Sequence, residues 1–227
     1  MAMPPFPSTA NIADACVTLG TDFAVLSGLR PVASPHMAGP AVPVRHYGSV
    51  DVFIEAIGTA APGSVLMVDN EARRDEGCIG DLVVREAKLA GLGGIAIWGC
   101  HRDSSELRQI GFPLFSLASF PRGPIETRKT SDERFESARF GDALVSADHF
   151  IIADEDGLLA VASSEWLAIR AEAEAIAARE AEQARLIEAG RSLRDQFRFE
   201  DYLRQREADP GLLFRAHLRR VGGEVER

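Results

Sequence analysis

Apolar residues fall along the chain in two kinds of stretch: short continuous runs, and longer runs of helical period. The short apolar runs predict β-strands over about residues 41–46, 64–69, 94–98 and 112–117, and the run 94–98, which carries no charge, predicts a strand covered on both faces. Between them, residues 50–60 and 81–90 place apolar side chains three or four positions apart, which predicts amphipathic helices. Strands that alternate with helices in this way indicate an α/β domain.

The stretches that flank this core extend the pattern. Ser8 or Thr9 can cap a short helix over about residues 10–19. Residues 139–162 predict two strands joined around Ala147-Asp148 and ended by the acidic turn Asp154-Glu155-Asp156-Gly157, which is more typical of a solvated hairpin than of a calcium loop. We therefore expect the α/β domain to occupy residues 1–162.

Residues 163–227 are predicted to form a helical arm. An alanine-rich stretch to about Ala189 predicts a long helix, residues 192–207 predict a second helical region, and a final helix follows the break at Asp209-Pro210-Gly211. The arginines of the arm are interleaved with acidic residues. We therefore expect it to pack on a neighbouring subunit rather than to act as a basic tail that binds another partner.

Composition narrows the classes of function. A chain of 227 residues with 46% hydrophobic content can bury a substantial core, and its net charge of −9 argues against a general nucleic-acid binder. No apolar run approaches the roughly 18 residues needed to span a membrane, and the start of the chain lacks the pattern of a signal peptide. We expect a cytoplasmic protein.

The cysteines do not predict a structural framework. Cys16, Cys78 and Cys100 are odd in number and lie in no metal-ligand spacing, so neither a disulfide framework nor structural zinc is expected. Cys100 precedes His101, which could suggest a thiolate nucleophile. Adjacent residues of an extended chain point to opposite sides, however, so we favour an inert thiol.

Candidate chemistry lies between Gly77 and Asp103. Asp81 opens the predicted helix 81–90, where free backbone N–H groups favour an anion. Arg102 and Asp103 follow the uncharged run 94–98, and so are expected just past the carboxyl end of a central parallel strand, where open α/β sheets place their ligand sites. Asp103 with Glu106 also fits a capping box, which would give the aspartate a structural role.

Asp81 and Arg102-Asp103, with twenty residues between, resemble the motif of the class II pyruvate aldolases that cleave 4-hydroxy-4-methyl-2-oxoglutarate. This RraA-like family also contains the regulator of ribonuclease activity A and many proteins once misnamed menaquinone methyltransferases. The resemblance extends over roughly residues 8–180. It includes the stretches Ser8 to Ala15, Gly39 to Val42, Val65 to Asp69 and Ala153 to Val161.

The resemblance implies a swivelling β/β/α domain with a mixed central sheet, assembled as a homotrimer or homohexamer with sites at subunit interfaces. It also implies an enolate of pyruvate, stabilised by a divalent cation, Mg²⁺ or Mn²⁺. By the resemblance, Asp103 would bind the metal directly, and Asp81 would hold metal-bound waters. Arg102 would bind the keto or enolate oxygen, and the backbone of Gly80, Asp81 and Leu82 the substrate carboxylate.

Several alternatives stay open at this stage. Retro-aldol cleavage and decarboxylation of oxaloacetate share the enolate, so the sequence does not separate them. The base that takes the 4-hydroxyl proton could be a water held by Asp81, an acid from another subunit, or His101. A lysine Schiff base is poorly supported, because the sequence contains only Lys88 and Lys129.

One loop departs from the family pattern. Asn70, Glu71 and Ala72 stand where family members often carry glycines, which narrows the approach of backbone to a ligand and puts the identity of the substrate in question. Because of this departure, an alternative to the aldolase function gains support that the motif alone does not give it. That alternative is a non-catalytic protein that regulates a ribonuclease by protein–protein binding.

Overall fold

The structure is a computed structural model that describes residues 6–222. The described chain divides into two compact units, one from Asp22 to Trp166 and one that joins the stretch before Asp22 to the stretch from Leu167 onward. The first helix therefore belongs to the same compact unit as the C-terminal helices. The sequence-based domain boundary between residues 162 and 163 stays a prediction.

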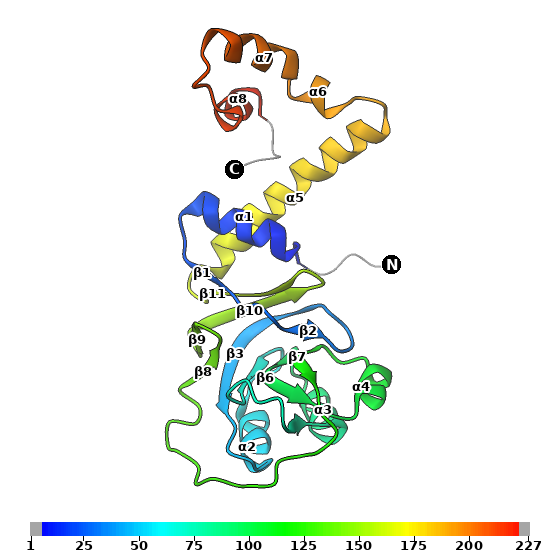
Figure 1. Ribbon diagram of the computed structural model, residues 1–227, viewed down its shortest axis with the longest axis vertical. Coiled ribbons are helices and arrows are strands. Elements are labelled where there is room, and N and C mark those ends of the chain that lie inside the picture. The colour runs from blue at the N-terminus through cyan, green and yellow to red at the C-terminus, as the bar shows by residue number, and fades with distance from the viewer. Residues whose placement is uncertain (1–5, 223–227) are drawn as a thin grey trace. The chain divides into compact units, whose positions relative to one another are not determined.

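A mixed sheet forms the centre of the first unit (Figure 1). Its middle strands run parallel in the order β3 (Met37–Arg45), β4 (Val65–Asp69), β6 (Gly94–His101) and β7 (Leu114–Ser119). The short β5 (Gly77–Ile79) also runs parallel to β6. The remaining strands of the sheet pair antiparallel with their neighbours; they are β1 (Phe23–Val25), β2 (Arg30–Pro31), β10 (His149–Asp154) and β11 (Gly157–Ala162). The predicted α/β class and mixed sheet are confirmed.

The parallel strands are joined by helices, as the alternating pattern predicted. These are α2 (Asp51–Thr59), α3 (Asp81–Leu89) and α4 (Ser104–Ile110). One core cluster unites α2, α3 and α4 with the sheet and includes Phe53, Leu66, Val84, Ile97 and Leu107. Since β4 is buried at every position and β6 at all but Trp98, their largely apolar sequences match strands covered on both faces.

The stretch before Trp166 contains four strands rather than two, so this part of the prediction was wrong. An extra hairpin, β8 (Ser137–Phe140) with β9 (Ala143–Ser146), precedes β10 and β11. Gly141, at φ 63°, makes its turn, a conformation that glycine adopts without strain. The predicted acidic hairpin turn between β10 and β11 is confirmed.

The second unit is helical. Its first helix, α1 (Thr9–Leu19), starts at a cap in which Ser8 Oγ accepts from Asn11 N at 3.1 Å. The Asn11 amide donates to Glu180 at 2.6 Å, which ties α1 to the long α5 (Trp166–Glu188). The chain continues through α6 (Leu193–Gln196), α7 (Phe199–Ala208) and α8 (Phe214–Val221).

The last three helices share an aromatic cluster, which gives this end of the chain a small core. Tyr202 and Phe214 approach with ring centroids 4.9 Å apart, and His217 Nε2 lies 2.7 Å from the carbonyl oxygen of Phe197. None of the helices among residues 6–222 is both long and apolar enough to cross a membrane. Contact between this arm and a neighbouring subunit stays a prediction.

Candidate active site

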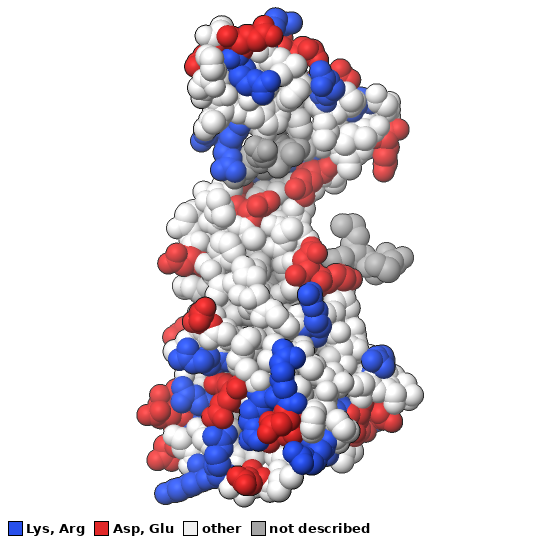
Figure 2. Space-filling model, in the orientation of Figure 1, with Lys and Arg blue, Asp and Glu red and all other residues white. Residues whose placement is uncertain are grey.

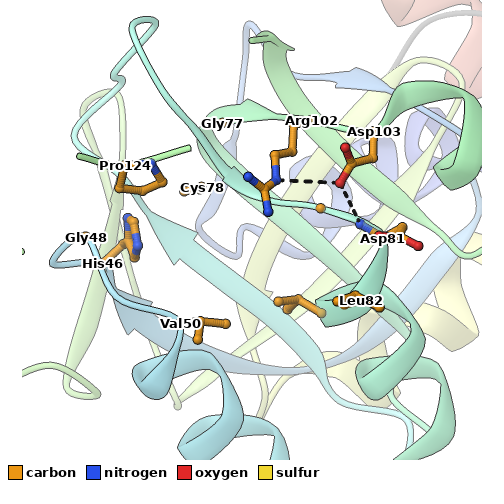
Figure 3. A pocket seen from close by; sticks show the side chains of 12 residues that line it. His46, Gly48, Val50, Gly77, Cys78, Asp81, Leu82, Arg102, Asp103 and Pro124 are labelled. Atoms are coloured by element: carbon orange, nitrogen blue, oxygen red, sulfur yellow. Dashed lines mark hydrogen bonds and ion pairs between the residues drawn. The ribbon is translucent and has the colours of Figure 1, made fainter. Parts of the chain in front are cut away.

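A cavity of about 340 Å³ lies at the carboxyl end of the parallel strands (Figure 3). Arg102 and Asp103 directly follow β6, and Asp81 is the first residue of α3, as the sequence pattern predicted. All five residues expected to form the site line this one cavity: Gly80, Asp81, Leu82, Arg102 and Asp103. The fold thus brings together two loops that are twenty residues apart in sequence.

The Asp103 carboxylate joins the two loops. Its Oδ2 accepts a hydrogen bond from Asp81 N at 3.3 Å and lies 3.5 Å from Arg102 Nε. Both contacts are drawn in Figure 3. Asp81 turns its own carboxylate toward Arg85, one helical turn on, at 3.3 Å. The cavity therefore presents one guanidinium and two carboxylates, each of them partly exposed, at 47% for Arg102, 38% for Asp103 and 26% for Asp81.

Gly80 makes room for this arrangement. A Cβ at residue 80 would overlap Asp103 Oδ2 and lie 3.1 Å from Arg102 Nε. The glycine is also the N-cap of α3 and has no side chain to cap it, so the Asp103 carboxylate supplies the acceptor from the neighbouring loop. An acidic side chain at a helix N-terminus is further stabilised by the helix dipole.

The capping box expected between Asp103 and Glu106 does not form. Asp103 occupies the N-cap position of α4 but makes no side-chain cap bond there, and Glu106 instead accepts from Ser105 Oγ at 2.8 Å. Asp103 has left-handed backbone angles, φ 60° and ψ 41°, which non-glycine residues seldom adopt. Its carboxylate therefore caps α3 rather than α4.

The uncommitted carboxylate oxygens fit a hard cation. Among the described residues, Oδ1 of Asp81 and Oδ1 of Asp103 have no hydrogen-bond partner. No group of three or more His, Cys, Asp or Glu side chains within residues 6–222 could hold a metal by itself. The residues present thus suit a cation such as Mg²⁺, which retains several waters and takes only one or two carboxylates from a protein.

His101, the histidine nearest the motif, is committed elsewhere. Its Nδ1 lies 2.7 Å from Ser116 Oγ and its Nε2 lies 2.8 Å from Ser104 Oγ. Burial lowers the pKa of His101, so the ring is neutral at pH 7. With both nitrogens occupied and no place among the cavity residues, His101 is not the base that the sequence left open.

The cysteines do not provide a nucleophile. Burial raises the pKa of both Cys78 and Cys100, so each thiol stays protonated near neutral pH. Cys16, Cys78 and Cys100 are all free. The inert thiol favoured for Cys100 from the sequence agrees with its environment.

A buried polar cluster beside the cavity was missed by the sequence analysis. His46, which follows β3 and lines the cavity, places Nδ1 2.8 Å from Asn70 Oδ1 and 3.8 Å from a carboxylate oxygen of Glu76. Glu76 also pairs with Arg73 at 3.2 Å. The one available sequence signal was that residue 46 closes a predicted parallel strand, where ligand sites occur.

In the loop that follows β4, two residues have the backbone conformation typical of glycine, although neither is a glycine. Glu71 and Ala72 have φ of 54° and 55°, in the left-handed region. The Ala72 N–H donates to the Trp98 carbonyl at 3.0 Å, and the Glu71 N–H donates to Asp69 at 2.9 Å, which holds the loop in this shape. Glycines would adopt this conformation without strain, which explains why a glycine loop suits this turn.

Charge is mixed over the surface in view. Figure 2 shows acidic and basic side chains intermingled rather than gathered into a basic surface. With a net charge of −9, this distribution agrees with the expectation that the chain is not a general nucleic-acid binder. That expectation stays a prediction.

The chain is similar to curated proteins that carry one shared name. A protein of Burkholderia multivorans is 28% identical over 161 residues, which cover 69% of this chain and 97% of that protein. A protein of Bacillus anthracis is 33% identical over 105 residues, 46% of this chain, and the match spans 65% of that protein's length. Each carries the name "Putative 4-hydroxy-4-methyl-2-oxoglutarate aldolase".

A solved structure and a family match extend the comparison. The crystal structure of Streptomyces coelicolor RraAS2, described as an unusual member of the RNase ES inhibitor RraA protein family, is 25% identical with a TM-score of 0.64. The likeness covers 77% of this chain and 89% of that one. The RraA-like family, described as Aldolase/RraA, matches residues 9–160. The chain therefore belongs to the RraA-like family.

Proposed function

We propose that this protein is a divalent-metal-dependent lyase that cleaves a 4-hydroxy-2-oxo acid, of the 4-hydroxy-4-methyl-2-oxoglutarate type, to pyruvate by a retro-aldol reaction. The observation that carries the proposal is the cavity in which Arg102, Asp81 and Asp103 meet at the carboxyl ends of parallel strands. The name shared by the curated relatives supports the same class of reaction.

Each side chain has a role that its chemistry permits. Arg102 is permanently charged and suits an oxygen on which negative charge develops. The first turn of α3 offers backbone N–H groups without helical acceptors, and Leu82 N–H is one that suits the substrate carboxylate. The Asp81 N–H already donates to the Asp103 carboxylate. It would therefore help to position that carboxylate rather than bind the substrate directly.

Asp103 would hold the cation, Mg²⁺ or Mn²⁺, and Asp81 would hold its waters, as their uncommitted oxygens permit. When bound, the cation would supply Lewis-acid stabilisation of negative charge on the substrate. A Schiff-base route lacks its lysine, because Lys88 donates to the Ile110 carbonyl at 2.9 Å and neither lysine lines the cavity.

Oxaloacetate decarboxylase activity belongs to the same proposal. Loss of carbon dioxide from oxaloacetate leaves the enolate of pyruvate, the same product that retro-aldol cleavage leaves before protonation. A site that stabilises the enolate therefore serves both reactions. Assembly as a homotrimer or homohexamer is also proposed, and light scattering on the purified chain would measure it.

The test is pyruvate release coupled to lactate dehydrogenase, from 4-hydroxy-4-methyl-2-oxoglutarate and from oxaloacetate, with Mg²⁺, with Mn²⁺ and with EDTA. Turnover that requires the metal and is lost in Asp103→Ala supports the proposal. A matched control is Asp75→Ala, which removes an exposed carboxylate that does not line the cavity. Pyruvate release no faster than the spontaneous rate with either metal would contradict it.

The alternative is a non-catalytic regulator of a ribonuclease that acts by protein–protein binding. The likeness to RraAS2 favours this candidate. Thermal unfolding with added Mg²⁺ or Mn²⁺ discriminates between the two, because a ligand of the native state raises Tm. A rise in wild type that Asp103→Ala abolishes supports the enzyme, whereas no rise with either cation favours the regulator.

A further inference from the structure

His46 is a further ionisable side chain on the cavity wall, outside the Asp–Arg–Asp motif. Figure 3 shows it across the cavity from Asp81 and Asp103, with the Arg102 guanidinium between them in this view. Its side chain is 1% exposed and its ring stacks on Phe53, with centroids 4.9 Å apart. A ring held this firmly has one orientation with respect to a bound ligand.

The neighbours of His46 fix where its proton lies. Nδ1 faces two acceptors, the Asn70 side-chain oxygen at 2.8 Å and a Glu76 carboxylate oxygen at 3.8 Å, so Nδ1 carries the hydrogen. In the neutral ring Nε2 is then the acceptor. Nε2 has no hydrogen-bond partner among the described residues, in contrast to Nε2 of His101.

Glu76 is itself held in place. Its side chain is 4% exposed and its carboxylate pairs with Arg73 at 3.2 Å, while the charged groups that face His46 are Glu76, Arg73 and Arg128. The carboxylate offsets the positive charge that the ring would acquire with a second proton. A buried acid that orients a histidine and stabilises its protonated form is the arrangement found in serine hydrolases.

Resting on the proposed lyase function, we propose that His46 Nε2 is the base that removes the 4-hydroxyl proton of the substrate, and that Asn70 and Glu76 are its positioning residues. The O–H bond breaks and its proton moves to Nε2. The electron pair left on oxygen forms the C4 carbonyl, the C3–C4 bond breaks, and its pair forms the enolate of pyruvate. Protonation at C3 by the His46 imidazolium then yields pyruvate and restores the neutral ring.

Comparing the two reactions of the proposed lyase tests whether His46 acts as the base. Retro-aldol cleavage begins with loss of a hydroxyl proton, whereas decarboxylation of oxaloacetate has no such proton to remove. His46→Gln should therefore lower kcat for 4-hydroxy-4-methyl-2-oxoglutarate by about 100-fold or more, and change oxaloacetate decarboxylation by less than about threefold. The matched control is His36→Gln, which alters a histidine outside the cavity.

A second variant tests the positioning residues without altering His46. Glu76→Gln removes the carboxylate that favours the protonated ring, so the acidic limb of the kcat/KM profile for the retro-aldol substrate should move to lower pH. Asp75→Asn is the matched control, because Asp75 also pairs with Arg73, at 3.1 Å, but does not contact His46. Its profile should coincide with that of wild type.

The outcomes distinguish the two proposals. Equal loss of both activities in His46→Gln, or retention of both, overturns the role of His46 while the lyase function stands. An unshifted profile in Glu76→Gln overturns the role of Glu76, and this test remains decisive if His46→Gln fails to fold. If wild type releases pyruvate from neither substrate, the lyase function fails and the base assignment fails with it.

Discussion

The cavity has two walls that handle charge differently. On one wall, Asp81, Arg102 and Asp103 are between 26% and 47% exposed. On the other, His46 lines the cavity and Glu76, which does not line it, lies 3.8 Å from the ring; we call this pair the buried wall, and both side chains are at most 4% exposed. Burial lowers the pKa of His46, against the opposing effects of Asn70 and Glu76. The side chains of Asp81, Arg102 and Asp103 are not buried in this way.

This difference indicates how the two walls divide the chemistry. Exposed charges are solvated, contribute little to stability, and are free to meet a ligand. Buried polar groups must satisfy one another, and their protonation depends on their neighbours. We therefore expect changes in the exposed wall to affect catalysis with little effect on folding, and changes in the buried wall to affect both.

The largest effect is expected on the exposed wall. Asp103→Asn keeps the shape of the side chain but removes its charge, and should lower kcat/KM for both substrates by about 10²–10³-fold. Its free energy of unfolding should change by less than about 1 kcal/mol, because its ion pair with Arg102 is solvated. Urea unfolding and coupled pyruvate release measure the two quantities. A large loss of stability would break the contrast between the walls.

The next largest effect is expected on the buried wall. Glu76→Ala leaves the His46 ring without its carboxylate and Arg73 with only Asp75, and should cost about 1–3 kcal/mol of unfolding free energy. Asp75→Ala removes an exposed, solvated carboxylate that pairs with the same arginine, so it should cost clearly less than Glu76→Ala. Urea unfolding of both variants makes the comparison. Equal losses would show that burial does not set the difference.

A smaller effect follows from pH. Because the pKa of His46 is lower in the folded chain than its ordinary value of 6.5, the unfolded chain takes up the proton first as pH falls. Stability is therefore full above about pH 6.5 and is lost as pH falls toward the folded pKa. Tm measured against pH should fall less steeply in His46→Gln, since His101 contributes equally in both proteins. Parallel curves would contradict this.

The smallest effect is expected in the loop after β4. Ala72→Gly relieves a left-handed alanine at φ 55° and should raise the unfolding free energy by up to about 1 kcal/mol, less the entropy that glycine adds to the unfolded chain. Ala90→Gly, at right-handed angles at the end of α3, is the control and should destabilise. Thermal unfolding measures both. Destabilisation by Ala72→Gly would show that the alanine is not strained.

Much of the fold could be read from local pattern. Short apolar runs predicted β3, β4, β6 and β7, and the position of Asp81 at the start of α3 was also predicted. Two strands were missed within residues 137–146, because each is only four residues long and mixes buried apolar with polar positions, which is too short a pattern to mark a strand. The short β5 was missed because three residues are too few to show a period.

The sequence by itself determined the central strands and helices, the family resemblance, and five of the residues that line the cavity, because these were read from spacing along one chain. Only the tertiary structure decided that Asp103 caps α3 and that His46 meets Asn70 and Glu76. The parallel register of β3 and β4 pairs Arg45 with Asp69, so the residues that follow each strand become neighbours. Register and burial act between distant segments, and local pattern does not encode them.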